Sequence, residues 1–495
     1  MKFMILNSWR FVLFFAAVFA LYWACPHKYR RFILLVSNAV FSLSWGIQGT
    51  LVVLGVALIS FFAGLGMERF EKNKKMIRTA AVAACILNLF VFKYLDFAIG
   101  TLESVASCFS IEFHPETMKI LLPLGISYYT LQAIGYISDV YREKIPAEHD
   151  VISHIVFISF FPQMTSGPIS RAGSILPQIK EERFFDYQKA DYAIKLIGVG
   201  LFKKLVVADN LAIYVNRVFS SATEYTGFSL LLAQCLYLIQ LYGDFGGYSD
   251  IAFGVAGLLG IDIPRNFNKS PYFATTINEF WTRWHLSLSG WLKDYVYIPL
   301  GGSRKGKLRK YVNLMITFFV SGLWHGADWS FVLWGAVHWV YQTVEGIFHI
   351  KNAPLPPKDG TFRVRSAAAL KRCFKIIFMF ILAIFAQIFF RAESVADAVH
   401  FIGHMFNGIQ NPVAYINDGL LANNWIQGGR LSFGIRLILC VVPLFIYDVC
   451  TERFDVIERV SKLKKPIRIS IYLLVIAFIC FFRSVDGVSF VYFQF

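Results

Sequence analysis

Long apolar runs, separated by short polar connections, alternate along most of this 495-residue chain. An apolar helix of about 17–25 residues spans a bilayer, and runs of roughly that length recur. The period-two alternation of a half-buried strand does not stand out. The pattern therefore predicts an all-α, polytopic integral membrane protein with about 11–12 transmembrane helices. The expected crossings fall near 9–25, 32–47, 49–67, 79–97, 117–138, 191–209, 226–242, 311–326, 328–349, 373–391, 432–449 and 468–484.

The connections between these runs differ in charge, which predicts their side of the membrane. Connections 98–118 and 392–431 are expected outside, together with both chain ends. The apolar run after Lys2 is interpreted as a retained first helix or signal anchor, because further apolar segments follow it directly. The strongly basic connections are assigned to the cytoplasm by the positive-inside rule; they are 26–31, 68–78, 303–310, 351–372 and 451–467.

Composition supports the membrane interpretation and excludes other classes. Hydrophobic residues make up 56% of the chain and aromatic residues 17%, above the roughly half that is typical of soluble domains. The net charge of +16 arises in short connections beside apolar runs, so it points to a lipid bilayer and not to nucleic acid. The eight cysteines form no Cys-x-x-Cys pair, which predicts neither a disulfide framework nor a cysteine metal site.

Residues 162–171 are expected to interrupt a helix, because they contain two prolines and a glycine, including Gly167 and Pro168. A broken helix at membrane depth is tolerated only where it is buried or lines a cavity. We therefore predict a re-entrant segment. An ordinary interfacial loop is the alternative.

A second interruption is expected around Asp244, Tyr248 and Asp250, which lie among glycines ahead of the short apolar piece 251–261. Two acids close to glycines at a membrane boundary suggest another re-entrant element. Their role can equally be structural, capping and hydrogen-bonding broken backbone.

His325 is the first candidate for chemistry, because it lies in an apolar run long enough to span a bilayer. A titratable imidazole at membrane depth is costly unless it faces a cavity and finds a partner. Gly322 and Gly326 flank it and can let backbones approach. Asp328 would orient the ring if the helix continued, but the intervening Gly-Ala can instead form a turn. The alternative is a histidine that merely hydrogen-bonds a neighbouring helix.

His285 is the second candidate. Trp281, Trp284, His285 and Leu288 follow the i, i+3, i+4, i+7 spacing, so they would share one face of a helix. That face is typical of an amphipathic helix at the membrane surface, with tryptophans at headgroup depth. On these residues alone, His285 can be one more interface residue.

Three motifs together resemble those of a known family. They are Arg283-Trp284-His285-Leu286-Ser287-Leu288-Ser289, Tyr297-Ile298-Pro299-Leu300-Gly301-Gly302 and Gly322-Leu323-Trp324-His325-Gly326. They resemble the signatures of membrane-bound O-acyltransferases, most closely the bacterial alginate O-acetyltransferase-like branch, with the teichoic-acid D-alanyl transferase as a cousin. The match is dense over 264–338.

The resemblance implies a helical bundle with re-entrant and interfacial helices around a central cavity. By position in the motifs, His325 matches the family's catalytic histidine and His285 its second functional histidine. We treat the chain as one membrane domain, 1–495, with N-terminal helices in 1–262, a histidine-bearing core in 263–349 and C-terminal helices in 350–495. The expected cavity or substrate-binding residues are Trp281, Trp284, Trp324, Asp328, Asp244, Tyr248, Asp250, Gly167 and Pro168.

The resemblance also implies the substrates and partners. The donor would be acetyl-CoA or another acyl thioester from the cytoplasm, with no tightly bound cofactor. The acceptor would be an extracytoplasmic glycan, such as alginate, peptidoglycan, another exopolysaccharide or teichoic acid. A separate extracytoplasmic acetyltransferase or esterase-like protein would complete the transfer, and the location would be the bacterial cytoplasmic membrane.

Acyl transfer to a hydroxyl needs a group that takes the hydroxyl proton, and a histidine suits that role. A covalent acyl-histidine remains an alternative to general-base catalysis. Metal binding by His285, His325 and His338 is disfavoured, because their aromatic surroundings lack the usual carboxylate partners. A polytopic transporter or flippase is the competing class, since broken helices suit both. The paired histidine motifs favour the enzyme.

Overall fold

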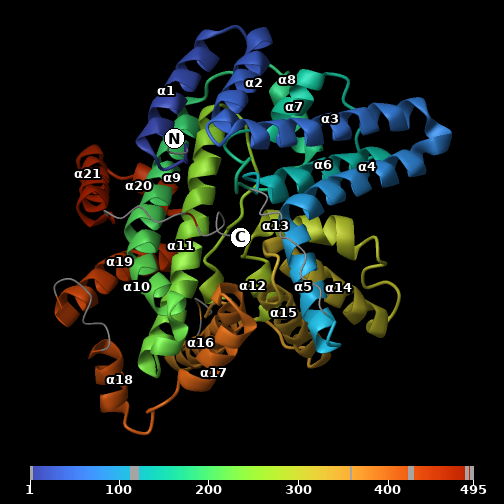
Figure 1. Ribbon diagram of the computed structural model, residues 1–495. Coiled ribbons are helices and arrows are strands. Elements are labelled where there is room, and N and C mark those ends of the chain that lie inside the picture. Colours follow the sequence, from blue (N-terminus) through green and yellow to red (C-terminus); the bar gives the residue numbers. More distant parts are fainter. Residues whose placement is uncertain are drawn as a thin grey trace. The chain divides into compact units, whose positions relative to one another are not determined.

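The computed structural model of the chain is helical wherever it is described. It describes residues 4–111, 122–356, 359, 361–421, 429–484 and 490. Within these ranges every regular element is a helix and no strand occurs (Figure 1), which confirms the all-α prediction. Parts of the two expected outer connections, 112–121 and 422–428, lie outside the described residues.

The helices form two compact units, the first of which comprises Met1–Ile197 and Tyr248–Arg265. Its helices are α1 (Trp9–Ala24), α2 (His27–Leu43), α3 (Ile47–Arg69), α4 (Lys74–Leu89), α5 (Leu95–Cys108), α6 (Ile126–Tyr141), α7 (Val151–Ser159), α8 (Ala172–Lys180) and most of α9 (Tyr187–Leu201). Helices α3, α4 and α6 pack side by side (Figure 1). Gly64 permits the contact of α3 with α6, since a Cβ there would lie 2.3 Å from the Tyr136 hydroxyl oxygen.

The second unit comprises Gly198–Gly247 and Asn266–Phe495. Its helices are α10 (Asp209–Ser220), the first part of α11 (Phe228–Leu258), α12 (Ile277–Trp281), α13 (Leu286–Leu292), α14 (Lys307–His325), α15 (Trp329–Ile347), α16 (Phe362–Arg391), α17 (Val395–His404), α18 (Pro412–Leu421), α19 (Gly429–Thr451), α20 (Val456–Ser461) and α21 (Lys465–Phe482). Helices α14 and α15 form a hairpin, and α15 also packs on α12 and α16. The core between these helices is rich in large aromatic side chains, among them Trp284, Trp334 and Phe390. The expected division at 262/263 and 349/350 within a single domain stays a prediction.

Six helical stretches of the described chain are long and apolar enough to cross a membrane. Each overlaps an expected crossing, which confirms a polytopic membrane protein. Two stretches run further than expected: Glu71–Cys108 continues as helix into the expected outer connection 98–118, and Phe228–Leu258 continues through the expected break after 242. The other six expected crossings stay predictions, including the two helices of the α14–α15 hairpin. The six stretches are Ile47–Arg69, Glu71–Cys108, Phe228–Leu258, Phe362–Arg391, Gly434–Thr451 and Lys465–Phe482.

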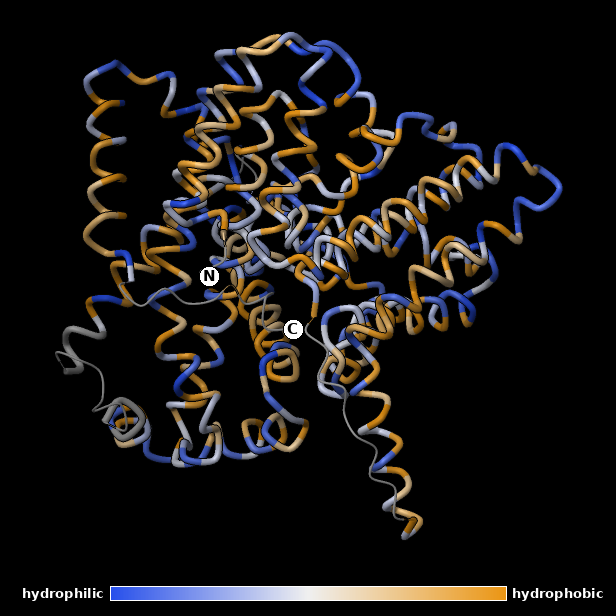
Figure 2. Tube along the Cα trace, turned by 45° about the horizontal axis from the view of Figure 1, so that its top comes forward, coloured by the Kyte–Doolittle hydropathy of each residue, from blue (hydrophilic) through white to orange (hydrophobic). Residues whose placement is uncertain are grey.

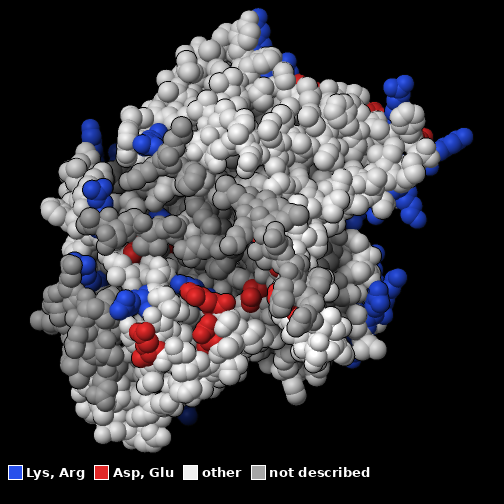
Figure 3. Space-filling view, in the orientation of Figure 1, with Lys and Arg blue, Asp and Glu red and all other residues white. Residues whose placement is uncertain are grey.

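Hydrophilic residues gather at the connections between helices, while the helices carry the apolar residues (Figure 2). The turn between α3 and α4 exposes Arg69, Lys72 and Lys75. Figure 3 shows Lys and Arg projecting at this turn from a face whose other visible side chains are largely uncharged. A cytoplasmic position for this turn is what the positive-inside rule predicts, and it stays a prediction.

The expected break in 162–171 is confirmed as an interruption of helix. Helix α7 ends at Ser159, and α8 begins only at Ala172. Gly167 is required for the turn itself, because a Cβ there would lie 2.3 Å from the Cα of Gln163. Residues 162–170 are all buried, as a non-helical backbone at membrane depth must be.

The expected second break is wrong, because α11 runs without interruption through Asp244, Tyr248 and Asp250 for 31 residues. Gly247 allows α11 to pack closely against a neighbouring segment of the chain. A Cβ on Gly247 would lie 2.7 Å from the carbonyl oxygen of Gly200 and 3.0 Å from the backbone nitrogen of Lys204. Glycine at such a helix interface lets backbones approach without ending the helix.

Candidate active site

His325 is the last residue of α14, at the closed end of the α14–α15 hairpin. The two helices approach closely because each carries a glycine at the contact. A Cβ on Gly322 would lie 2.3 Å from the carbonyl oxygen of Phe331, and one on Gly335 would lie 2.4 Å from that of Phe318. His325 is therefore set by a rigid contact between two neighbouring helices.

The imidazole of His325 is buried among aromatic rings. Its centroid lies 4.9 Å from that of Trp324, 5.0 Å from Trp334 and 5.1 Å from Phe390. The His285 ring is 6.3 Å away, at an interplanar angle of 63°. The two histidines, 40 positions apart in the chain, therefore lie in one cluster of aromatic rings.

Asp328 does not orient His325, because the chain turns at Gly326 and the helix does not continue. Asp328 instead caps the N-terminus of α15, where one carboxylate oxygen accepts the Ser330 N–H at 2.7 Å. A short acceptor at this position satisfies a helix N–H that has no partner within the helix. Of the two alternatives for these residues, the turn is the correct one.

The predicted amphipathic helix through His285 is wrong. Helix α12 ends at Trp281, α13 begins at Leu286, and His285 between them has a left-handed backbone with φ 44° and ψ 54°. Trp284 and His285 are 2% and 0% exposed, so neither lies at an interface with water or headgroups. The tertiary contacts of this turn outweigh the helical spacing of its apolar residues.

Two of the three predicted tryptophans lie against histidine rings, and the third, Trp284, stacks on Phe280 at 5.7 Å. Trp324 lies 5.8 Å from His285, centroid to centroid, and Trp281 lies 5.0 Å from His338. Trp334, which the sequence reasoning did not select, lies between His325 and His338 at 5.0 and 4.9 Å. Burial lowers the pKa of His285 to about 3, so its ring is neutral at pH 7.

Asn266, which sequence reasoning also missed, lies against His285. Its side-chain oxygen is 3.2 Å from His285 Nδ1 and accepts the Ser287 hydroxyl at 2.6 Å. Asn266 is separated from His285 by 19 positions along an irregular stretch. No local pattern signals such a contact.

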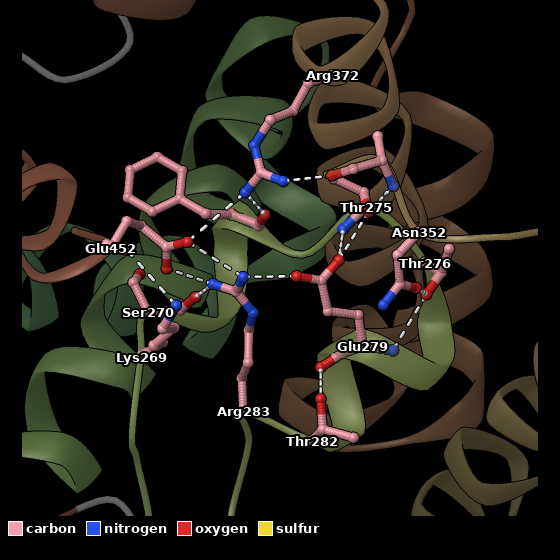
Figure 4. A network of polar contacts seen from close by, with 12 residues as sticks. Lys269, Ser270, Thr275, Thr276, Glu279, Thr282, Arg283, Asn352, Arg372 and Glu452 are labelled. Carbon is pink, nitrogen blue, oxygen red and sulfur yellow. Dashed lines mark hydrogen bonds and ion pairs between the residues drawn. The ribbon is translucent and has the colours of Figure 1, made fainter. Parts of the chain in front are cut away.

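Arg283, two positions before His285, lies in a network of ion pairs and hydrogen bonds (Figure 4). Its guanidinium binds both carboxylate oxygens of Glu452, donates to Glu279 and donates to the Ser270 carbonyl at 3.0 Å. Although burial opposes the charged form of Glu279, hydrogen bonds from Thr275 and the charge of Arg283 hold the pKa of Glu279 below its usual value. Arg283 therefore remains in a satisfied ion network despite being 5% exposed.

Asp244 has a structural partner in the same unit. Lys204 Nζ lies 2.6 Å from a carboxylate oxygen of Asp244 and 2.8 Å from one of Asp209. All three side chains are at most 6% exposed. Asp250 lies further along the helix and is partly exposed. The ion pair gives Asp244 a structural contact, although no broken backbone is present for it to cap. A cavity role for Asp244 and Asp250 stays a prediction.

Tyr248, Gly167 and Pro168 belong to the other unit. The hydroxyl of Tyr248 hydrogen-bonds that of Thr165, which lies within the 162–171 stretch. Within this unit the contact ties α11 to the turn. A cavity role for these three residues stays a prediction.

Among the residues that the structure describes, no three His, Cys, Asp or Glu side chains gather as they would around a metal ion. The three core histidines are lined by Trp and Phe instead. A reaction carried by side chains alone remains the expectation for this site.

Comparison with known proteins connects this architecture to a family. Residues 142–386 match the family model of the membrane-bound O-acyltransferases. That stretch contains the hairpin with His325, the turn with His285 and the 162–171 break. It ends within α16.

Curated relatives resemble most of the chain. A probable alginate O-acetylase of Pseudomonas aeruginosa is 34% identical over 410 residues, covering 82% of this chain and 75% of the relative. The peptidoglycan O-acetyltransferase of Helicobacter pylori is 32% identical, covering 76% and 74%. The teichoic acid D-alanyltransferase of Bacillus subtilis is 28% identical, covering 59% and 74%.

Proposed function

Since this chain belongs to the membrane-bound O-acyltransferase family, we propose that it passes an acetyl group from a cytoplasmic thioester toward hydroxyls of an extracytoplasmic polysaccharide. The names of its relatives support an acceptor in the cell envelope. Alginate O-acetylases and a peptidoglycan O-acetyltransferase match over three quarters or more of the chain, whereas the teichoic acid enzyme matches less of it. This favours acetyl transfer to a glycan over alanyl transfer.

The main support for the proposal is that two buried histidines lie close together. His285 and His325 come from separate motifs, yet their rings lie 6.3 Å apart behind a wall of tryptophan and phenylalanine. An imidazole buried at such a place costs free energy unless it is used or paired. Two of them, converging from 40 positions apart, support a reaction centre more strongly than either alone.

His325 is proposed as the general base. The acceptor hydroxyl oxygen forms a bond to the acyl carbon, the acyl–sulfur bond breaks, and the thiolate leaves. The hydroxyl proton passes to the imidazole and from there to the thiolate, so charge and protons balance. The alternative is a two-step transfer. His325 itself attacks the acyl carbon and forms an acyl-histidine, and the acceptor hydroxyl then takes the acyl group from it.

The donor is proposed to arrive from the side of the basic connection 303–310, which leads into α14 and exposes Arg304, Lys305, Lys307 and Arg309. Cations there can attract the phosphates of a coenzyme A thioester and also mark the cytoplasmic side. A separate extracytoplasmic acetyltransferase or esterase-like protein is the proposed partner. The proposed location is the bacterial cytoplasmic membrane.

The test is to purify the protein and follow radiolabelled acetyl-CoA and other acyl thioesters. Loss of the acyl group should depend on His325, and His325→Ala should lower the rate by at least about a hundredfold, as for removal of a general base. His154→Gln is a matched control, because His154 is a fully buried histidine that hydrogen-bonds Ser60 at 2.8 Å in the first unit. Near wild-type turnover in His325→Ala would overturn the assignment, provided that both variants remain folded in detergent.

A further inference from the structure

Asn266 makes three hydrogen bonds to three successive residues of the His285 turn. Its side-chain oxygen faces His285 Nδ1 at 3.2 Å and accepts the Ser287 hydroxyl at 2.6 Å. Its backbone oxygen accepts the Leu286 N–H at 3.0 Å. Asn266 and Ser287 are 1% and 7% exposed. All three hydrogen bonds are therefore buried, and together we call them the Asn266 clamp.

The clamp decides which nitrogen of His285 carries the proton. An amide oxygen is an acceptor only, and the Ser287 hydroxyl already donates to the oxygen of Asn266. The His285 nitrogen that faces this oxygen must therefore donate, so Nδ1 carries the hydrogen. In a neutral imidazole the other nitrogen, Nε2, then holds the lone pair. Burial keeps the ring neutral.

The backbone conformation of His285 indicates that this turn is held in place by its contacts. A non-glycine residue with φ 44° costs of order 1–3 kcal/mol, and such strain persists only where surrounding contacts enforce it. The Leu286 N–H on the Asn266 backbone and the Arg283 ion network enforce it from both sides of the residue. Residues held this way cluster at functional sites.

We propose that Asn266 is a positioning residue that fixes His285 as the Nδ1–H tautomer, so that His285 serves the reaction as an acceptor at Nε2. This rests on the proposed function of the two histidines in acyl transfer. An Nε2 with a lone pair cannot donate to a developing oxyanion, so stabilisation of that oxyanion falls to another group. What Nε2 can do is accept a proton or hydrogen bond from a hydroxyl or from an N–H.

The first test uses Asn266→Ala and Asn266→Asp. The alanine variant should lose about 10- to 100-fold in kcat, by analogy with removing the hydrogen-bond partner that orients a metal-binding histidine, with the donor KM within about twofold. The aspartate variant keeps an acceptor facing Nδ1 and should recover most of kcat at high pH. Its negative charge should move the acid limb of the kcat profile upward by about one to three pH units.

The matched control is Asn313→Ala, which removes another buried asparagine bond, from its side-chain nitrogen to the Gly302 carbonyl at 2.9 Å. This variant should lower the stability of the folded protein, but the pH at which kcat falls on acidification should stay as in the wild type. If Asn266→Asp is as inactive as Asn266→Ala and has the wild-type acid limb, Asn266 is only structural and the proposal is overturned.

The second test does not depend on activity. Nitrogen-15 NMR of histidine-labelled protein in lipid nanodiscs should show His285 with a protonated Nδ1 and a bare Nε2, assigned by the signals lost in His285→Gln. Asn266→Ala should abolish that preference. A protonated Nε2 and bare Nδ1 in the wild type would overturn the tautomer assignment. If the NMR spectra show the Nδ1–H tautomer of His285 but the protein consumes no acyl thioester, the proposed acyl transfer is wrong and the tautomer assignment stands.

Discussion

The two histidines of the core are held in place by different kinds of interaction. His325 ends a 19-residue helix, and its position follows from backbone hydrogen bonds and a glycine-mediated contact with the next helix in the chain. His285 lies in a turn between helices of five and seven residues. That turn is fixed by polar contacts to Asn266 and to Glu452, which is 169 positions from Arg283. The first site should withstand loss of one polar partner, and the second should not.

The largest effect is expected from Arg283→Met, which would leave the Glu279 and Glu452 carboxylates buried without their shared guanidinium. Removing one partner of a buried ion network costs about 3–5 kcal/mol. Equilibrium unfolding in mixed micelles should show this loss, with kcat falling as the His285 turn relaxes. Arg309→Met, at an exposed position, is the control. A loss below about 1 kcal/mol would mean that the turn does not depend on the network.

A smaller effect is expected from acidification. The pKa of His285 is about 3 in the folded protein and about 6.5 in an unfolded chain, so the unfolded state binds more protons between these values. The contribution of the neutral His285 ring to the free energy of unfolding is complete above pH 6.5 and is lost as the pH falls toward 3. Between pH 7 and pH 5 the loss is about 2 kcal/mol.

The measurement compares unfolding at pH 7 and pH 5 for the wild type and His285→Asn. Asparagine tolerates the left-handed backbone but does not titrate in this range. The wild type should lose more stability than the variant on acidification. Equal losses would contradict a buried neutral imidazole at this position.

The smallest effect is expected from Asp328→Ala at the hairpin turn. Loss of the cap on α15 should cost about 1 kcal/mol and leave the pH profile of kcat unchanged, because Asp328 bonds Ser330 and not His325. Asp328→Asn should keep the cap and nearly all of the stability. A shifted pH profile in either variant would revive an orienting role for Asp328.

Features that depend on one local segment were predictable. Apolar run length located the six spanning helices, and the prolines of 162–171 located the gap between α7 and α8. The motif resemblance paired His285 with His325, and the structure brings their rings together. Each of these signals is contained in a short stretch of chain.

Features that depend on distant partners were not predictable. The helical spacing of Trp281, Trp284 and Leu288 is real, yet the turn at His285 is decided by Asn266 and Glu452. The glycines at 246 and 247 suggested a break in α11, but the helix continues, and Gly247 packs against the backbone of Gly200 and Lys204. A glycine can either end a helix or admit a neighbour, and only the neighbour's position distinguishes the two.

The end of α14 at His325 has an electrostatic consequence. The aligned peptide dipoles of a helix place about half a negative charge at its C-terminus, where a nearby cation gains typically 0.3–1 kcal/mol and up to about 2 kcal/mol when partly buried. His325 occupies the last turn of its helix and is 4% exposed. A proton taken up by this imidazole during acyl transfer would therefore be stabilised by the carbonyl end of the helix that carries it.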